Sequence, residues 1–285
     1  ENETSLLVTI FNLRQALRIP TCFLPLIVSI DTLLILCACA YMHAQEFALG
    51  ADISWTTELE SKGQKLYNYQ GEEREAFTLM KELGLNAVRL RVWVDPTQTV
   101  QQPGERQMGA NGWCGKDDVL AKALRAKKAG LDVMIDFHYS DWWADPGKQN
   151  IPAAWAKHKY KQMLKDVADH TTEVLQLLKD NGVEPKWVQV GNETSNGFLW
   201  PIGQLSENPS QYAGLFASGY EASKKVFPNA KVIVHLDNGF DDALYERNLD
   251  ALKNGGAKWD IIGMSIYPYW AKDSGKEPSA ARLFY

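Results

Sequence analysis

The sequence predicts an α/β protein of the (β/α)8 TIM barrel class, and three observations favour it. From residue 47 onward, short apolar segments typical of β-strands alternate with longer segments of helical periodicity. A polar or aromatic residue follows each strand-like segment, as expected where parallel strands end together on one rim of a barrel. No glycine-rich phosphate turn follows the first strand, which disfavours the alternative of a doubly wound open sheet.

The predicted strands are apolar runs bounded by glycine or polar residues, and they comprise residues 47–52, 87–94, 132–137, 187–190, 231–235 and 260–265. Helical periodicity with a terminating glycine or aromatic residue predicts helices over residues 70–84, 117–130, 157–182, 210–227 and 241–255. Side chains alternate along a strand, so Arg89, Arg91 and Trp93 share one face. Strands that alternate with helices in this way form a parallel sheet with right-handed crossovers.

Residues 1–46 form a separate segment with the features of an export signal. Arg14 and Arg18 precede an apolar run over residues 19–42, which ends in small residues, as a secretory signal does. The sequence Leu-Cys-Ala-Cys at residues 36–39 also resembles a bacterial lipobox, in which Cys39 would carry the lipid. We therefore expect an exported protein that is extracellular, periplasmic or lipid-anchored at the cell surface.

An uncleaved membrane anchor is the alternative, since about 20 apolar residues can span a bilayer. Asp31 lies in the middle of the run and costs about 2.5 to 3.5 kcal/mol there, which disfavours spanning. We expect membrane contact only through a lipid anchor. Residues 47–285 then form the incomplete barrel domain, and Cys114 is its single cysteine.

Composition excludes some partners and favours others. The net charge is -5 with no basic run, which argues against a nucleic-acid surface. The chain has 10 Trp, 11 Tyr and 10 Phe, and aromatic rings both fill cores and stack on sugars. Its 5 histidines are scattered without the spacing of a metal site, so we expect no metal ligands.

The segment WVQVGNETSNGFLW, residues 187–200, carries the strongest catalytic pattern. Glu193 directly follows a core strand, where a carboxylic acid could protonate a leaving oxygen and then take a proton from water. The amide of the preceding Asn192 could hold a sugar hydroxyl. The same residue types also cap helix N-termini, which is the structural alternative for this tripeptide.

Longer motifs resemble the endo-β-1,4-galactanases of glycoside hydrolase family 53, and they lie at residues 88–96, 111–118, 136–155, 187–201 and 260–270. The resemblance spans about residues 47–285. It implies a (β/α)8 barrel that hydrolyses β-1,4-galactan side chains of pectin with retention of configuration. Galactan polysaccharides or oligosaccharides would be the partners, and no cofactor is implied.

The resemblance also assigns roles to individual residues. Glu193 matches the general acid/base, and Asn192 matches the residue that binds the sugar 2-hydroxyl. Arg91 matches an arginine that keeps the nucleophile ionised. The remaining matches line the cleavage site or stack on galactose, and they are His138, Tyr267, Trp143 and Trp200. We interpret His235 as a packing or hydrogen-bonding residue.

The family's nucleophile is a glutamate at the end of barrel strand seven, and we find no matching strand in the sequence. Residues 271–285 read as an extended tail, and Glu277 comes too early to be that glutamate. Strands seven and eight are thus missing from this chain, together with the calcium-binding loop that some bacterial members carry between them. We expect an inactive fragment of low stability, because its edge strands and an apolar barrel interior would be exposed.

Two other functions remain open. A carbohydrate-binding protein that lacks the nucleophile would bind galactan without cleaving it. A barrel endo-hydrolase for another β-1,4-linked polysaccharide, such as mannan or cellulose, would share the acid/base but differ in substrate.

Overall fold

The computed structural model describes residues 47–98 and 111–267. The expected export signal with Cys39 lies outside the described residues, as do the segment 271–285 and Glu277. Within the described part of the chain, no helix is long and apolar enough to cross a membrane.

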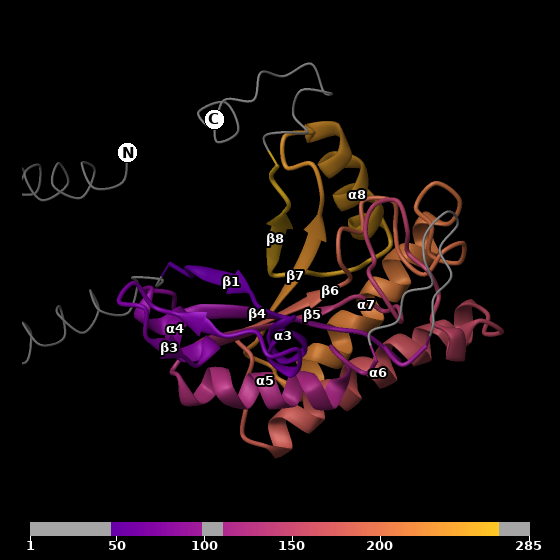
Figure 1. Ribbon diagram of the computed structural model, residues 1–285. Helices are drawn as coiled ribbons and strands as arrows, with labels where there is room; N and C mark the ends of the chain where they lie inside the picture. The colour runs from indigo at the N-terminus through magenta and orange to yellow at the C-terminus, as the bar shows by residue number, and fades with distance from the viewer. Residues whose placement is uncertain (1–46, 99–110, 268–285) are drawn as a thin grey trace, which may run out of the picture. The chain divides into compact units, whose positions relative to one another are not determined.

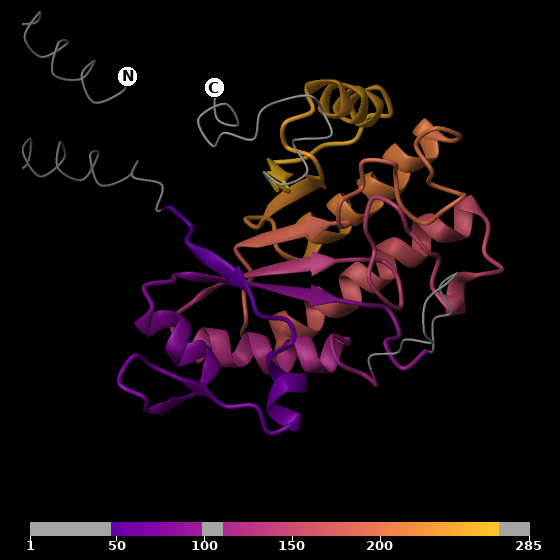
Figure 2. The same ribbon diagram turned by 45° about the horizontal axis from the view of Figure 1, so that its top comes forward.

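The centre of the structure is a curled, parallel six-stranded sheet whose strand order follows the chain order (Figures 1 and 2). Its strands are β1 (Gly50–Asp52), β4 (Ala87–Val92), β5 (Asp132–Phe137), β6 (Trp187–Val190), β7 (Lys231–Leu236) and β8 (Ile261–Met264). Each neighbouring pair is parallel and in continuous register. The six predicted strands are therefore confirmed, and the sheet is the arrangement expected for part of a (β/α)8 barrel.

Helices form the crossovers between successive strands. They are α3 (Thr56–Ser61), α4 (Ala76–Glu82), α5 (Lys116–Lys128), α6 (Tyr160–Asp180), α7 (Pro209–Val226) and α8 (Asp242–Asn254), with a 3-10 turn at Ala153–Trp155. In both views α5, α6 and α7 lie along one face of the sheet (Figures 1 and 2). The helices predicted over residues 117–130, 157–182, 210–227 and 241–255 are confirmed to within a few residues at each end.

The helix predicted over residues 70–84 is wrong in its first half. Residues Leu66–Tyr67 (β2) and Glu73–Arg74 (β3) pair as a short antiparallel hairpin before the helix starts. The helix α4 begins only at Ala76, where the Glu75 side chain accepts a hydrogen bond from the Thr78 amide at 2.8 Å. Charged residues with good helix propensity thus enter a hairpin, because strand pairing overrides a weak local preference.

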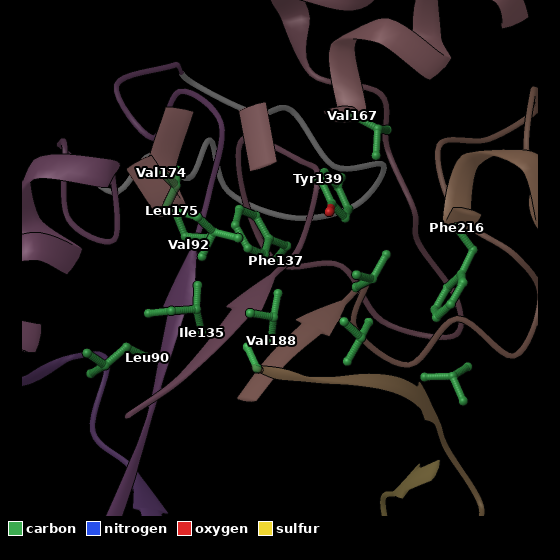
Figure 3. Packing of buried hydrophobic residues seen from close by; sticks show 14 of the residues in the cluster. Leu90, Val92, Ile135, Phe137, Tyr139, Val167, Val174, Leu175, Val188 and Phe216 are labelled. Carbon is green, nitrogen blue, oxygen red and sulfur yellow. The ribbon is translucent and has the colours of Figure 1, made fainter. Parts of the chain in front are cut away.

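Alternation along the strands divides the sheet into an apolar and a polar face. Figure 3 shows Leu90, Val92, Ile135, Phe137 and Val188 in the packed layer, together with α6 and α7 side chains labelled Val174, Leu175 and Phe216. The alternate positions on the other face carry buried polar side chains: Arg91, Asp136 and Gln189. The expectation of an apolar barrel interior is therefore wrong at these positions, and the inner face carries ion pairs instead.

Candidate active site

The carboxyl ends of the strands surround a pocket of about 410 Å³ on the polar face. Every strand of the six-stranded sheet contributes at least one lining residue, either from the strand itself or from the loop that follows it. The lining residues are Asp52, Trp55, Arg89, Arg91, Trp143, Ala144, Asp145, Asn192, Glu193, His235, Ser265 and Tyr267. Barrel enzymes place their catalytic groups at the rim where the carboxyl ends of the strands converge.

Glu193 enters this pocket from a tight turn after β6. Gly191 and Glu193 both have a positive φ, of 82° and 48° respectively. A Cβ atom on residue 191 would lie 2.4 Å from Cγ2 of Thr194, so only glycine fits there. The Thr194 amide donates to the carbonyl oxygen of His235 at 2.9 Å, which ties the turn to β7.

The helix-cap alternative for this tripeptide is wrong. The next helix, α7, begins at Pro209 with Asn208 as its cap residue, far along the chain from Asn192. Glu193 instead holds a left-handed backbone conformation that is uncommon for a non-glycine residue. Such conformations cost free energy and collect at functional sites.

The electrostatic surroundings of Glu193 favour its protonated form. Burial raises the pKa of its carboxyl group, a hydrogen bond with Ser265 lowers it, and the nearby carboxylates of Asp237 and Asp145 raise it again. The net result is a pKa above the ordinary value. A carboxyl group that holds its proton closer to neutral pH is suited to act as a general acid.

Asn192 is held from several sides beside Glu193. Its Oδ1 atom accepts a hydrogen bond from Nη2 of Arg89 at 2.8 Å, and its Nδ2 atom donates to the carbonyl oxygen of Ala144 at 2.8 Å. The Gln149 side chain donates to the backbone carbonyl of Asn192 at 2.9 Å. These contacts fix both the orientation of the amide and the course of the backbone.

Arg89 joins this amide to two carboxylates. Its Nη1 atom lies 2.7 Å from Oδ2 of Asp52, and its Nη2 atom lies 2.7 Å from Oδ2 of the buried Asp136. Burial alone would raise the pKa of Asp136, but Arg89 and the adjacent His138 lower it to about 2. Gln189 donates a short hydrogen bond to the other oxygen of this carboxylate. Asp136 is thus an ionised anchor beneath the pocket.

Arg91 lies against aromatic rings rather than against a row of carboxylates. Its Cζ atom is 3.9 Å from the ring centroid of Trp143, 4.8 Å from that of Trp55 and 5.1 Å from that of Trp93. Its nearest carboxylate in the described part of the chain is Asp52, at 3.7 Å. The guanidinium therefore supports the aromatic wall of the pocket by cation–π contacts.

The structure brings five of the predicted site residues into the pocket lining: Glu193, Asn192, Arg91, Trp143 and Tyr267. His138 does not line it, because it is buried beneath Trp143, with Nε2 3.0 Å from Asp136 and Nδ1 accepting from the Ala144 amide at 3.0 Å. Trp200 also lies outside the lining, and its indole donates to the Asn196 carbonyl at 2.9 Å. Their predicted substrate contacts remain predictions.

Sequence reasoning missed several lining residues, including Arg89, Trp55 and Ser265. Arg89 shares the strand face of Arg91, so alternation along β4 was a signal that pointed to both arginines. Asp52 is the polar residue at the end of the first predicted strand, residues 47–52, and the sequence gives no further sign of its role. His235, interpreted as a packing or hydrogen-bonding residue, does form hydrogen bonds, and it also borders the pocket.

Within residues 47–98 and 111–267, no group of three or more histidine, cysteine, aspartate or glutamate side chains is arranged to hold a metal ion. Cys114 is a free, buried thiol behind the aromatic wall. Burial raises its pKa despite the nearby Lys122 and Arg91. The chemistry that the described pocket offers is therefore that of carboxylates, amides, cations and aromatic rings.

The sequence is similar to one family of carbohydrate-active enzymes, since residues 48–279 match the family model described as glycosyl hydrolase family 53. The endo-β-1,4-galactanase of Bacillus subtilis (strain 168) is 33% identical over 230 residues, which cover 79% of this chain and 50% of that protein. The arabinogalactan endo-β-1,4-galactanase of Cellvibrio japonicus (strain Ueda107) is 36% identical over 236 residues, which cover 80% of this chain and 59% of that protein.

Solved structures give the same result. The GH53 catalytic domain of Ignisphaera aggregans superposes with a TM-score of 0.71 at 39% identity, over 79% of this chain and 60% of that one. A fungal β-1,4-galactanase superposes with a TM-score of 0.70 at 33% identity, over 78% of this chain and 64% of that one. The barrel class is confirmed, and the chain spans about half to three fifths of the length of these curated relatives.

Proposed function

Because the chain belongs to glycosyl hydrolase family 53, we propose that it is part of an endo-β-1,4-galactanase with Glu193 as the general acid/base. The observation that carries this proposal is a partly buried carboxyl group of raised pKa, at the rim of a parallel barrel sheet and beside a rigidly held asparagine. The names of the relatives supply the substrate class, (arabino)galactan.

The proposed reaction proceeds with retention of configuration. Glu193 gives its proton to the oxygen of the scissile β-1,4 bond while a second carboxylate attacks the anomeric carbon, and the leaving chain departs with that proton. The ionised Glu193 then takes a proton from water, which attacks the sugar–enzyme intermediate and releases it. Asn192, whose amide is fixed by Arg89 and Ala144, binds the 2-hydroxyl of the sugar during both steps.

The covalent intermediate requires a second carboxylate about 5 to 5.5 Å from the first. Within the described residues, the other carboxylates in the pocket lining are Asp52 and Asp145. Asp52 accepts hydrogen bonds from Ser54 and pairs with Arg89 and Arg91, which commits its oxygens to the protein. We propose that the nucleophile is outside the described residues and that the 285-residue chain binds galactan without cleaving it.

The aromatic wall provides the proposed sugar platform. Arg91 covers one face of the Trp143 ring, at 3.9 Å from the centroid, and the ring borders the pocket. β-Galactose presents a broad apolar face opposite its axial hydroxyl, and such a face stacks on an indole. We propose that the natural substrate is the β-1,4-galactan of pectin side chains.

We propose that the protein is exported, because an enzyme encounters a polysaccharide of this kind outside the cytoplasm. The segment 1–46, with its apolar run over residues 19–42 and with Cys39 as the candidate lipid-bearing residue, supports the proposal. Mass determination of the amino-terminal peptide from the protein's host distinguishes cleavage with acylation at Cys39 from free secretion.

Calorimetric titration of the 285-residue chain tests the substrate class. We expect β-1,4-galactotetraose to bind, and cellotetraose and mannotetraose to bind more weakly or not at all. Tighter binding of either of the latter would favour a hydrolase of another β-1,4-linked polysaccharide. Binding of none of the three would overturn the proposed function.

Incubation of the same chain with galactan tests the assignment of the nucleophile. We expect no release of reducing ends, with a Glu193→Gln chain as the control that binds equally well. Release of galacto-oligosaccharides by the wild-type chain alone would show that a carboxylate such as Asp52 acts as the second catalytic group.

A further inference from the structure

The His235 ring makes contacts that a single neutral imidazole cannot satisfy at once. Its Nδ1 atom lies 3.0 Å from Oδ1 of Asn192 and 3.2 Å from the backbone nitrogen of Glu193. The first contact needs Nδ1 to donate a proton, whereas the second needs Nδ1 to accept one. A neutral imidazole carries one N–H, so each contact belongs to a different tautomer.

The orientation of Asn192 makes this conflict real. Arg89 donates to Oδ1 at 2.8 Å, and Nδ2 donates to the carbonyl oxygen of Ala144 at 2.8 Å. The atom that faces His235 is therefore the amide oxygen, which only accepts hydrogen bonds. Flipping the amide would bring donor groups together at Arg89 and acceptors together at Ala144.

The other side of the ring is connected to the carboxyl group of Glu193. Nε2 of His235 lies 3.0 Å from Oγ of Ser265, and Ser265 also hydrogen-bonds to the Glu193 side chain. A serine hydroxyl has a single proton to donate. It can donate to His235 or to Glu193, and it accepts from the other.

We propose that Ser265 and His235 form a relay in which the tautomer of His235 follows the protonation state of Glu193. With Glu193 protonated, its hydroxyl donates to Ser265, Ser265 donates to Nε2, and Nδ1–H donates to Asn192. With Glu193 ionised, Ser265 donates to the carboxylate, Nε2–H donates to Ser265, and Nδ1 accepts from the Glu193 amide. The ring exchanges one proton for another through solvent, and the net proton released is the one that Glu193 loses.

This inference rests on the proposed role of Glu193, which alternates between the two states during the reaction. In the acid state, His235 adds a donor to the oxygen of Asn192 and so helps to hold the amide against the sugar. In the base state, Ser265 stabilises the new carboxylate. His235 and Ser265 are thus positioning residues, which give each protonation state of Glu193 its own set of hydrogen bonds.

Burial and the nearby cations favour the neutral form of the His235 ring. Burial and Arg89 lower the pKa of His235 to about 4, although Asp136 opposes them, and His138 also lowers it. The charged groups that act on Glu193 are Asp237, Asp145 and Arg89, with a net raised pKa. Burial therefore acts on the two groups in opposite directions, since it lowers the pKa of His235 and raises the pKa of Glu193.

Nitrogen NMR of the 285-residue chain labelled with ¹⁵N-histidine tests the relay, since the ring nitrogens distinguish the two neutral tautomers. We expect His235 to change from the Nδ1–H to the Nε2–H form as pH rises, with the midpoint of the Glu193 carboxyl resonance. His138 is the internal control, because its Nδ1 accepts from the Ala144 amide and its Nε2 faces Asp136, so we expect its tautomer to stay constant.

Three variants separate the relay from simple packing. Glu193→Gln removes the titrating group, so the His235 tautomer becomes independent of pH. Ser265→Ala uncouples the ring from the carboxyl group and raises the pKa of Glu193, because a hydrogen bond that lowers it is lost. Ser265→Thr keeps the hydroxyl and restores the coupled change.

A constant tautomer of His235 across the titration of Glu193 in the wild-type chain would overturn the proposal, as would a change that persists in Ser265→Ala. Neither readout requires turnover or sugar. A chain that shows the relay but binds no galactan would contradict the proposed function and leave the relay intact.

Discussion

Nη2 of Arg89 lies 2.8 Å from Oδ1 of Asn192, so a single guanidinium joins β4 to the turn that carries Glu193. The same nitrogen lies 2.7 Å from Oδ2 of Asp136 on β5. Strands that are distant in the sequence thus share one polar network beneath the pocket. Asp136 and Asn192 are buried and Arg89 is partly buried, which makes each contact costly to lose.

Replacing Arg89 by methionine should destabilise the fold strongly. The substitution leaves the fully buried Asp136 carboxylate without its guanidinium partner, and loss of one member of a buried ion pair costs on the order of 3 to 5 kcal/mol. Arg74→Met is the matched control, because its side chain is similarly exposed (29% against 24%) but pairs with exposed Glu72 and Glu82. We expect that variant to lose much less stability than Arg89→Met, because water screens exposed ion pairs.

Urea denaturation at neutral pH measures both variants. Equal losses for Arg89→Met and Arg74→Met would contradict the assignment of Arg89 to a buried network. A double variant, Arg89→Met with Asp136→Asn, should recover part of the loss, since it removes the unpaired charge.

Gly191→Ala should displace the catalytic turn. The new methyl group would lie 2.4 Å from Cγ2 of Thr194, in addition to the strain of a positive φ. Gly256→Ala is the control, because Gly256 has a φ of 77° with no atom within 4 Å of the added Cβ. We expect Gly256→Ala to lose about 1 kcal/mol from backbone strain and Gly191→Ala to lose more. Thermal unfolding of both chains gives the comparison, and equal losses would show that the turn absorbs the methyl group.

Trp143→Ala should weaken the binding of galactotetraose about tenfold or more, which corresponds to about 1.4 kcal/mol. The ring borders the pocket and also supports Arg91, so its removal opens the aromatic wall. Trp200→Ala should change the affinity little, because Trp200 is outside the pocket lining. Calorimetry measures the affinity of both variants for galactotetraose. A larger loss of affinity in Trp200→Ala than in Trp143→Ala would identify Trp200 as the sugar platform.

Much of the barrel could be predicted from local pattern alone. Strands such as Asp132–Phe137 are continuous apolar runs, and helices such as Tyr160–Asp180 carry a clear apolar stripe that ends near a glycine. The hairpin formed by Leu66–Tyr67 and Glu73–Arg74 escaped this reasoning. Each of its strands has only two residues, too few for any periodicity. Their pairing depends on contacts between two separate segments, which the helix propensity of single residues does not report.

The site could be predicted where a role follows from position after a strand, as it does for Glu193 and Asn192. For His138 and Arg89, the direction of the side chain in the folded protein determines the role. His138 follows β5 and shares the strand face of Asp136, but the sequence does not show that its ring lies beneath Trp143 rather than in the pocket lining. The role of Arg89 depends on its ion pair with Asp136 of β5 and on its hydrogen bond to the Asn192 amide in the turn after β6. Only the folded sheet brings these groups together.

His170 should make the fold sensitive to mild acid. Its ring is packed among Phe137, Tyr139 and Trp155 at centroid distances of 5.7, 6.2 and 6.1 Å. Its Nε2 atom is buried without a hydrogen-bond partner in the described part of the chain. Burial lowers its pKa from 6.5 to about 4.

Between these two pH values the unfolded chain binds a proton at His170 and the folded chain does not. This contribution to stability is therefore fully present above pH 6.5 and declines as the pH falls towards about 4, with a slope of up to about 1.4 kcal/mol per pH unit. His170→Phe removes the titrating group and fills the aromatic site, so it should flatten the decline. His235 keeps its own contribution, because its pKa is also lowered to about 4.

The measurement is the free energy of unfolding in urea at a series of pH values from 4 to 7. His158→Phe is the control, since the His158 ring is more exposed and pairs with Asp166 at 2.7 Å. An unchanged pH profile in His170→Phe would mean that the folded protein already accommodates a charged imidazole among these three rings. A flatter profile in His170→Phe, but not in His158→Phe, would assign acid sensitivity to the aromatic cluster outside the proposed catalytic pocket.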